Sequence, residues 1–248
     1  IAHDNAHRQL ITPSLTCKVE TFGFHPEADY QIIFDPAVKR VGILRDGMWT
    51  IQWTNPMPGS HNALNAAAAA IHAANLGVDW TDIIAPLENF GGVDRRLQKL
   101  GTLPCNGGSA IVYDDYGHHP TEIELTLNAL RAAELPKRLI CVFQPHQHSR
   151  TRFLLDAFAQ SFSSADVIIV PHIYFVRDSI AEQQRVSAQD LVDRLTAQGA
   201  SAKHINDFDD IVDHLCKIVK DGDLIVIMGA GPVTTIGHKL VKSSLRVP

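Results

Sequence analysis

Apolar and polar positions follow two different patterns along this chain of 248 residues. After about residue 108, short apolar runs alternate with longer stretches that carry apolar residues at i, i+3 and i+4. Apolar strands that alternate with amphipathic helices predict an α/β fold with a mostly parallel sheet, covered by helices on both faces. The runs expected to be strands are AIVYDD, RLICVFQPH, DVIIVPHIY, AKHIN and DLIVIMGAG. The stretches expected to be helices include PTEIELTLNALRAAE, TRFLLDAFAQSFS, SAQDLVDRLTAQG and DFDDIVDHLCKIV.

The first part of the chain has shorter apolar runs, separated by Gly, Pro and Asp. KVETFGF, DYQIIF, RVGILRDG and WTIQW predict strands, and a long Ala-rich helix follows, which ends at Gly77. DWTDIIAPLENF predicts a second, shorter helix. The stretch GTLPCNGGSA is rich in Gly and Pro and has no apolar period, so it is the expected domain boundary. We therefore expect one domain over residues 1–107 and a second over residues 108–248.

The composition indicates a globular protein, because 45% of the residues are hydrophobic and 20% are charged. A net charge of −5 leaves no basic field for nucleic acid or an anionic membrane, and no apolar run is long enough to span a bilayer. The four cysteines are far apart in the sequence and predict reduced thiols in a cytoplasmic protein. The chain starts at Ile1, inside what looks like a strand, so we expect a piece of a longer polypeptide.

Polar residues gather where the strands of the second part end. In an open α/β sheet, ligands bind at the carboxyl ends of the strands. Several such clusters at one edge favour a ligand site over ordinary loop polarity. The clusters are Asp114, Asp115 and Tyr116; His146, His148, Ser149 and Arg150; His172, Tyr174 and Arg177; and Gly229 with Gly231.

The segment DDYGHHPTEI places two carboxylates and two histidines immediately before a helix. Pro120 suits the first turn of a helix, and Glu122 suits its positive end. Helix capping does not explain Asp115 or the pair His118 and His119. No metal site is predicted among the histidines, because the spacing typical of structural zinc ligands is missing.

Three further motifs have both a ligand-binding and a structural interpretation. Asn62 and Asn65 lie on one face at the start of the Ala-rich helix; their carboxamides suit the edge of an adenine, but Asn62 also suits a helix cap. The adjacent Arg95 and Arg96 suit phosphate oxygens or a solvated surface. MGAGP, which starts at Met228, is a glycine turn that favours close packing over ligand binding.

Together these stretches resemble the Mur ligases. HNALNAAAA, GVDRRLQ, DDYGHHPTEI, FQPHQHSRT and HIYFVRDS occur in the order typical of that family, and nearest to its alanine-adding branch. The resemblance implies the remainder of a central ATPase domain, followed by a Rossmann-like C-terminal ligase domain. It also implies a cytoplasmic step of peptidoglycan synthesis, in which ATP and Mg²⁺ activate the lactyl carboxylate of UDP-N-acetylmuramate as an acyl phosphate and L-alanine attacks it.

The resemblance also implies a role for individual residues. Adenine would lie against His61, Asn62 and Asn65. Arg96 would address the phosphates, and Asp115 would hold the ribose. The remaining three residues, His118, His146 and Arg150, would face the substrate carboxylate or the alanine.

The chain departs from the family pattern in two respects. The glycine-rich phosphate loop, the Mg²⁺ ligands that follow it and the UDP-sugar domain are absent from residues 1–248, so we expect this chain alone to be inactive. Gln147 stands where many relatives have Arg, and His172 replaces an acid. Two alternatives therefore stay open, a sister ligase that adds a tripeptide and a non-catalytic nucleotide-binding module.

Overall fold

The computed structural model describes residues 1–243 and divides the chain into two compact units. Unit 1 comprises Ile1–Gly92, and unit 2 comprises Val93–Pro248. This division lies ahead of the boundary expected after residue 107, because residues 98–105 pair with the sheet of unit 2. No helix among the described residues has the length and apolar character needed to cross a membrane.

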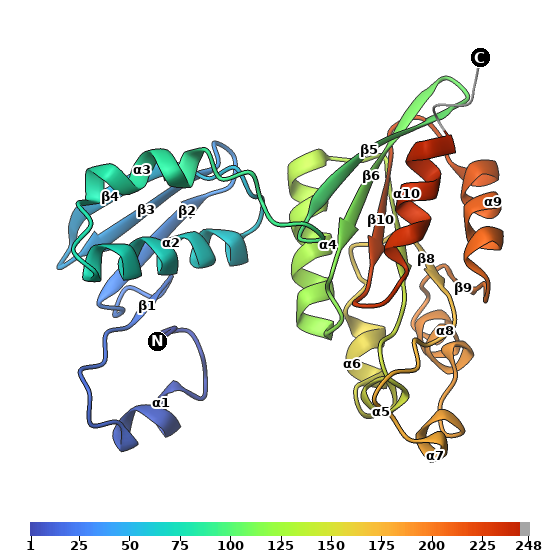
Figure 1. The fold of residues 1–248 in the computed structure, drawn as a ribbon, viewed down its shortest axis with the longest axis horizontal. Helices are drawn as coiled ribbons and strands as arrows, with labels where there is room; N and C mark the ends of the chain where they lie inside the picture. Colours follow the sequence, from blue (N-terminus) through green and yellow to red (C-terminus); the bar gives the residue numbers. More distant parts are fainter. Residues whose placement is uncertain (244–248) are drawn as a thin grey trace. The chain divides into compact units, whose positions relative to one another are not determined.

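Unit 1 contains a four-stranded sheet in the order β1-β2-β3-β4 (Figure 1). Strands β2, β3 and β4 are antiparallel, and the short β1 runs parallel to β2. Ile32 lies opposite Ile43, which in turn lies opposite Ile51, so one face of the sheet is apolar. The strands are β1 (Phe22–Gly23), β2 (Tyr30–Asp35), β3 (Arg40–Arg45) and β4 (Met48–Thr54).

Two helices, α2 (Ser60–Asn75) and α3 (Trp80–Glu88), cover the apolar face of this sheet. Ala63, Ala67 and Ala70 of α2 are fully or almost fully buried. These small side chains allow the helix backbone to approach the sheet closely. A short helix, α1 (Arg8–Ile11), and a 3₁₀ helix, Thr12–Ser14, precede the sheet and contribute no buried residue.

Unit 2 is built on a six-stranded sheet in the order β5-β6-β10-β7-β8-β9. The five strands from β6 to β9 in this order are parallel, and β5 at the edge is antiparallel to β6. The α/β fold with a mostly parallel sheet is therefore confirmed. The strands are β5 (Gln98–Cys105), β6 (Gly108–Asp115), β7 (Arg138–Phe143), β8 (Val167–Val170), β9 (Ala202–His204) and β10 (Asp223–Met228).

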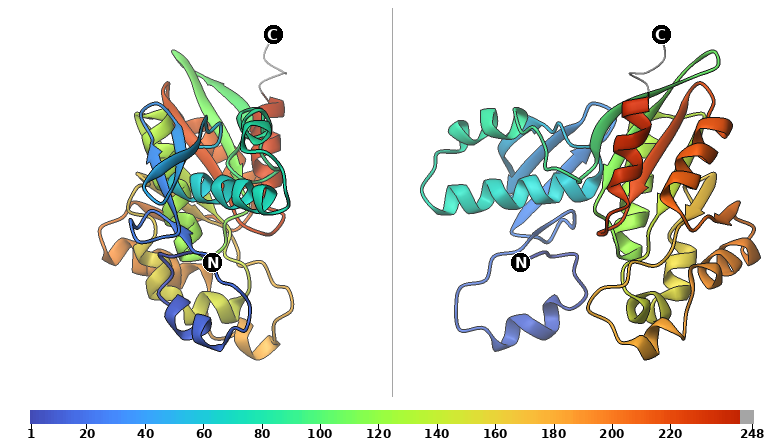
Figure 2. Two further views of the ribbon diagram at one scale, coloured as in Figure 1. Left: turned by 90° about the vertical axis from the view of Figure 1, so that its left-hand side faces the viewer. Right: turned by 45° about the vertical axis from the view of Figure 1, so that its right-hand side comes forward.

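Helices cover both faces of this sheet, as the alternation of buried side chains requires. Val142 belongs to a cluster with Leu215 of α9 and Leu240 of α10, whereas Phe143 packs on the other face against Phe158 of α6. Figures 1 and 2 show α9 and α10 side by side. The helices are α4 (Pro120–Glu134), α5 (His148–Phe153), α6 (Leu155–Gln160), α7 (Ile180–Gln183), α8 (Ala188–Ala197), α9 (Phe208–Ile218) and α10 (Thr234–Ser243).

Two local expectations from the sequence are wrong. The stretch that starts at Gly101 is a β-hairpin and not a linker, because Cys105 pairs with Gly108 across a tight turn. The helix expected over residues 151–163 is split into α5 and α6, with a break at Leu154.

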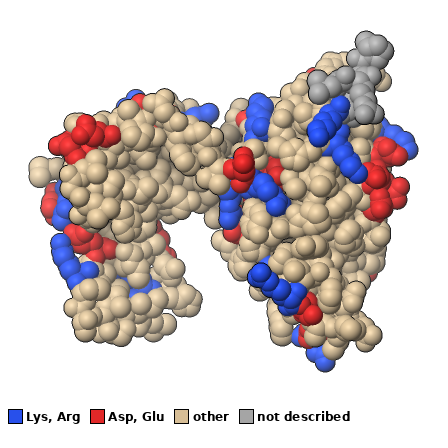
Figure 3. Space-filling view, viewed as in Figure 1, with Lys and Arg blue, Asp and Glu red and all other residues tan. Residues whose placement is uncertain are grey.

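The distribution of charged side chains and the state of the cysteines follow the expectations from the sequence. Basic and acidic side chains are scattered over the face in view, without a broad basic field there (Figure 3). All four cysteines lie within the described residues, and none of them forms a disulfide.

Candidate functional site at the carboxyl edge of the unit 2 sheet

The loops after β6, β7, β8 and β10 meet at one edge of the unit 2 sheet, as expected for parallel strands. Within this edge, Tyr174 donates its backbone N–H to Pro145, and its carbonyl accepts from Gln147. The loops that follow β7 and β8 are thereby held together. The expected convergence of polar loops within unit 2 is confirmed.

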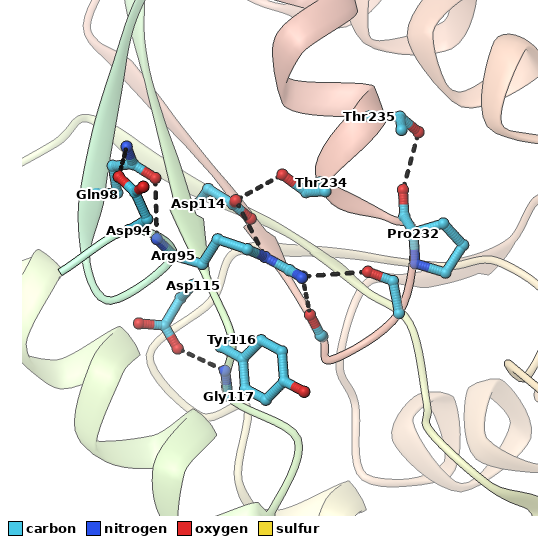
Figure 4. A network of polar contacts seen from close by, with 12 residues as sticks. Asp94, Arg95, Gln98, Asp114, Asp115, Tyr116, Gly117, Pro232, Thr234 and Thr235 are labelled. Atoms are coloured by element: carbon cyan, nitrogen blue, oxygen red, sulfur yellow. Dashed lines mark hydrogen bonds and ion pairs between the residues drawn. The ribbon is translucent and has the colours of Figure 1, made fainter. Parts of the chain in front are cut away.

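Arg95 joins three segments of unit 2 at this edge (Figure 4). Its Nη2 donates to the carbonyl oxygens of Gly229 at 2.5 Å and Gly231 at 3.1 Å. Its Nε lies 3.5 Å from Oδ2 of Asp114, which also accepts from the Thr234 hydroxyl at 2.6 Å. Arg95 therefore connects the start of unit 2 to the end of β6 and to the turn after β10.

Burial sets the electrostatics of the Asp114 carboxyl group, which is fully inaccessible to solvent. Burial raises the pKa of Asp114, and the hydrogen bond from Thr234 and the charge of Arg95 oppose this shift. The two donors stabilise the carboxylate form, which has no access to water. Neither Arg95 nor Thr234 was singled out by the sequence as a partner of Asp114.

The neighbouring Asp115 is held by backbone groups. Its two oxygens accept from the N–H groups of Leu97 at 2.9 Å and Gly117 at 2.8 Å, and the residue is only 3% exposed. Burial raises its pKa against these hydrogen bonds. Asp115 thus fixes the entry to β5 and the loop after β6, and its contact with a ribose stays a prediction.

Tyr116 presents its ring to both adjacent arginines. The guanidinium carbon of Arg95 lies 4.9 Å from the ring centroid, and that of Arg96 lies 5.5 Å from it. Arg96 also lies 3.5 Å from the Glu122 carboxylate and is about half exposed. The two arginines therefore differ: Arg95 is anchored within the fold, and Arg96 is available to a ligand.

The start of α4 is capped by a histidine, which the sequence analysis did not anticipate. The His119 side chain accepts from the backbone N–H of Thr121 at 3.3 Å, and the backbone N–H of His119 donates to the Glu122 carboxylate at 3.2 Å. Burial acts to raise the pKa of Glu122, but the His118 backbone N–H and the charges of His118 and Arg96 outweigh it, so the pKa is lowered. His119 has a structural role that leaves His118 for the site.

His118, His146 and Arg150 lie together, as predicted. The rings of His118 and His146 are 5.9 Å apart, and Nδ1 of His146 lies 3.2 Å from Nη1 of Arg150. Tyr174 lies beside this group, with its ring centroid 5.6 Å from that of His146. Three loops thus contribute to one cluster of rings and a guanidinium.

Glu122 lies 3.5 Å from His118, but no carboxylate pairs with the Arg150 guanidinium of this cluster among the ion pairs of the described residues. Burial lowers the pKa of His146, with Arg150, His118 and Arg177 adding to the effect, so its ring is neutral at neutral pH and accepts from Arg150. Within residues 1–243, Arg150 forms no ion pair with a carboxylate. The arrangement suits an anionic group of a ligand, such as a carboxylate or a phosphate.

A cavity of about 540 Å³ adjoins the cluster through Tyr174. His148, Phe175, His172 and His204 are among the residues that line it. Nδ1 of His148 is buried without a hydrogen-bond partner, and burial lowers the pKa of this histidine. The cavity is mostly neutral and partly aromatic, and its volume is in the range of small-molecule sites.

The residues predicted to bind adenine lie in unit 1, on the first turns of α2. Asn62 donates its side-chain N–H to the carbonyl oxygen of Pro58 at 2.8 Å, which supports the structural interpretation of this residue. Asn65 is exposed, and His61 is half-buried. The adenine contacts stay a prediction.

The glycine turn after β10 serves close packing, as the sequence favoured. A Cβ on Gly229, which has a φ of 145°, would lie 2.8 Å from the backbone oxygen of Gln144. A Cβ on Gly231 would lie 3.0 Å from the Tyr174 ring. The turn thereby presents the two carbonyl oxygens that Arg95 binds.

Comparison with known proteins agrees with this arrangement. The chain is 38% identical over 237 residues to a UDP-N-acetylmuramate–L-alanine ligase of Agathobacter rectalis and 37% identical to one of Clostridium novyi; each alignment covers 94% of this chain and 50% of the relative. The chain therefore spans about half the length of these curated relatives.

Solved structures show the same fold. A UDP-N-acetylmuramate–alanine ligase of Thermotoga maritima superposes with a TM-score of 0.70 at 23% identity, covering 90% of this chain and 47% of that one. A murein peptide ligase of Psychrobacter arcticus superposes with a TM-score of 0.63 at 26% identity, covering 90% and 45%. The family described as Mur ligase, glutamate ligase domain, matches residues 95–231, which are more than half of the sequence and include Arg95, Asp114 and Arg150. The chain belongs to the Mur ligase family.

Proposed function

We propose that this chain is the C-terminal part of an ATP-dependent ligase that joins L-alanine to UDP-N-acetylmuramate in peptidoglycan precursor synthesis. Unit 1 would complete the central ATP-binding domain, and unit 2 would be the C-terminal ligase domain. The family and the two alanine-adding relatives support this assignment.

The observation that carries the proposal is the unpaired Arg150 guanidinium beside the neutral His146 ring. An amide-forming ligase must hold an anionic carboxyl group and the developing oxyanion, and a fixed guanidinium suits both. His146 would keep Arg150 in place by accepting its hydrogen bond. His118, whose Nδ1 lies 3.1 Å from the Tyr116 carbonyl oxygen, would present its ring on the other side of the substrate.

The side chains at the described edge of unit 2 suit phosphate oxygens better than they suit Mg²⁺. The exposed Arg96 of unit 2 would contact phosphate oxygens. The adenine contacts of Asn62 and Asn65 in unit 1 are a separate prediction. Asp115 uses both oxygens on backbone N–H groups, and Asp114 faces Arg95 and Thr234. We therefore assign Mg²⁺ to residues that precede this chain, where it would neutralise phosphate charge.

The proposal is tested with the full-length protein encoded by the gene that contains this sequence. Incubation with ATP, Mg²⁺ and UDP-N-acetylmuramate should release phosphate only when L-alanine is added. The chain of residues 1–248 alone should release none, because it contains no phosphate loop. Nucleotide binding without amino-acid-dependent phosphate release by the full-length protein would instead indicate a non-catalytic module.

A second candidate function, the addition of a tripeptide, is favoured by the cavity beside Tyr174. Its volume of about 540 Å³ is large for alanine, and the murein peptide ligase of Psychrobacter arcticus shares the fold. The two functions are separated by supplying L-alanine or a tripeptide to the full-length protein at equal concentration. Faster phosphate release with the tripeptide would replace the first proposal by the second.

A further inference from the structure

Unit 1 carries a group of metal-ligating side chains apart from the residues discussed above. His3, His25 and Glu27 each offer a ligand atom, and these atoms all lie within 4.8 Å of one another. We propose that these three residues form a binding site for Zn²⁺ or a similar divalent transition-metal ion. The site would join the segment before β1 to the loop between β1 and β2.

The two imidazoles are brought together by contacts that do not depend on a metal. The rings of His3 and His25 are stacked, with centroids 5.0 Å apart and planes inclined by 11°. Between them in the sequence, Asp4 accepts the backbone N–H groups of Phe24 at 2.8 Å and His25 at 3.3 Å. The loop that carries His25 and Glu27 is therefore already held against the segment that carries His3.

Hydrogen bonds also favour one tautomer of the His3 ring. The Thr21 hydroxyl donates to Asp29 at 2.8 Å, so it accepts from Nδ1 of His3 at 3.4 Å. Nε2 of His3 then keeps its lone pair, as required of a metal ligand whose other ring nitrogen binds an oxygen. The long 3.4 Å contact from Arg8 to this nitrogen is replaceable, because Arg8 also donates to the His3 carbonyl oxygen at 3.1 Å.

The lone pair of the neutral His25 ring lies on Nδ1, where a metal ion would replace one long hydrogen bond. This Nδ1 accepts the backbone N–H of Glu27 at 3.2 Å, so the nitrogen is unprotonated in the neutral ring. Both His25 and Glu27 are exposed and can adjust to an ion. Two imidazoles and a carboxylate are donors that suit Zn²⁺, with a fourth position left for water or another ligand.

A metal ion bound here would link residues 1–20 to the loop between β1 and β2, where apolar packing does not hold them together. None of residues 1–20 is buried, and the segment is held by backbone bonds such as the one from His3 to the carbonyl oxygen of Phe22. An ion bound only in the folded arrangement stabilises that arrangement by mass action. We therefore expect Zn²⁺ to tighten the segment onto the sheet of unit 1.

The test is calorimetric titration of the metal-free full-length protein with ZnCl₂, with MgCl₂ as the comparison ion. Glu27→Gln and His25→Ala should each weaken the tightest Zn²⁺ site by at least about tenfold, since even supporting residues of metal sites have effects of that size. His7→Ala is the matched control in the same exposed segment and should leave the affinity unchanged. Unchanged Zn²⁺ affinity in Glu27→Gln would overturn the proposal.

Limited proteolysis gives a second, independent measurement. Trypsin should cut the wild-type protein after Arg8 or Lys18 several-fold more slowly with Zn²⁺ than without it. The His25→Ala protein should be cut at one rate in both conditions, and its circular dichroism should match the wild type. Equal protection of the variant by Zn²⁺ would show that the ion binds elsewhere.

Discussion

The Arg95 guanidinium binds the carbonyl oxygen of Gly229 at 2.5 Å, across 134 positions of the sequence. The same side chain lies 3.5 Å from the buried Asp114 carboxylate. The first residues of unit 2 are thus attached to two parallel strands at their carboxyl ends. Arg95 therefore fixes the start of unit 2 against its sheet.

Replacement of Arg95 by Ala should destabilise unit 2 substantially. The change removes two hydrogen bonds to carbonyl oxygens and leaves Asp114 buried with one fewer partner. Removing one partner of a buried charge costs more than the mean hydrogen bond, so we expect a loss of about 2–4 kcal/mol in the free energy of unfolding. Urea denaturation followed by circular dichroism measures this loss.

The adjacent Arg96 provides the control for that experiment. Its contact with Glu122 at 3.5 Å joins two partly exposed side chains. Arg96→Ala should therefore cost less than about 1 kcal/mol. Equal losses for the two variants would contradict the anchoring role of Arg95.

Thr234→Val should also destabilise unit 2. The hydroxyl of Thr234 donates to Asp114 at 2.6 Å, and Val keeps the shape of the side chain but not the donor. The expected loss is about 1–3 kcal/mol, because the buried carboxylate loses a hydrogen bond that it cannot replace with water. Thr235→Val is the control; that hydroxyl bonds only to the nearby Pro232 carbonyl oxygen in an exposed turn, and its loss should cost no more than about 0.5 kcal/mol.

Local patterns were sufficient to predict most elements of unit 2. Residues 120–134 were predicted as one helix, and α4 has these bounds because Pro120 starts it and Ile123, Leu127 and Leu130 share its buried face. The β5–β6 hairpin was missed, because its Pro and Gly residues indicate a linker unless the partner strand is known.

The convergence of His118, His146 and Arg150 was predicted from strand ends and from family resemblance. The Arg95 and Thr234 contacts were not, because each joins residues more than 100 positions apart and depends on the register of β6 against β10. The sequence gives no local sign of such a pair. The arginine pair itself suited either phosphate oxygens or a solvated surface, and only the structure separates the anchored Arg95 from the exposed Arg96.

Stability should fall as the pH falls below the ordinary pKa of histidine, in part because of His148. Burial lowers the pKa of His148 from its ordinary value of 6.5, and Asp178 acts in the opposite sense. Below pH 6.5, His148 takes up a proton in the unfolded chain more readily than in the folded protein. The contribution of His148 to the free energy of unfolding is therefore complete above pH 6.5 and is lost as the pH falls through the pKa of the folded state.

His148→Gln removes this titrating group and should reduce the difference in urea midpoint between pH 7.5 and pH 5.5. His146, whose pKa is also lowered, retains part of the dependence. His7→Gln is a suitable comparison, because that side chain is exposed and forms no cap hydrogen bond. A pH dependence in His148→Gln identical to that of the wild type would show that this ring does not titrate with folding.

Arg150→Ala in the full-length enzyme should reduce turnover far more than stability. Arg150 contacts only the His146 ring through its described hydrogen bonds, so its guanidinium is free to bind a substrate anion. Loss of one such stabilising group lowers kcat by about 10²–10³-fold, whereas the free energy of unfolding should change by about 0.5 kcal/mol or less.

Arg152 provides the control, because it lies on the same helix but bonds to Glu182 at 2.8 and 3.1 Å. Arg152→Ala should leave turnover within about twofold of wild type, which is a change of less than about 0.5 kcal/mol in the activation barrier. Steady-state phosphate release with saturating ATP measures both variants, and equal rates for Arg150→Ala and wild type would remove Arg150 from the site.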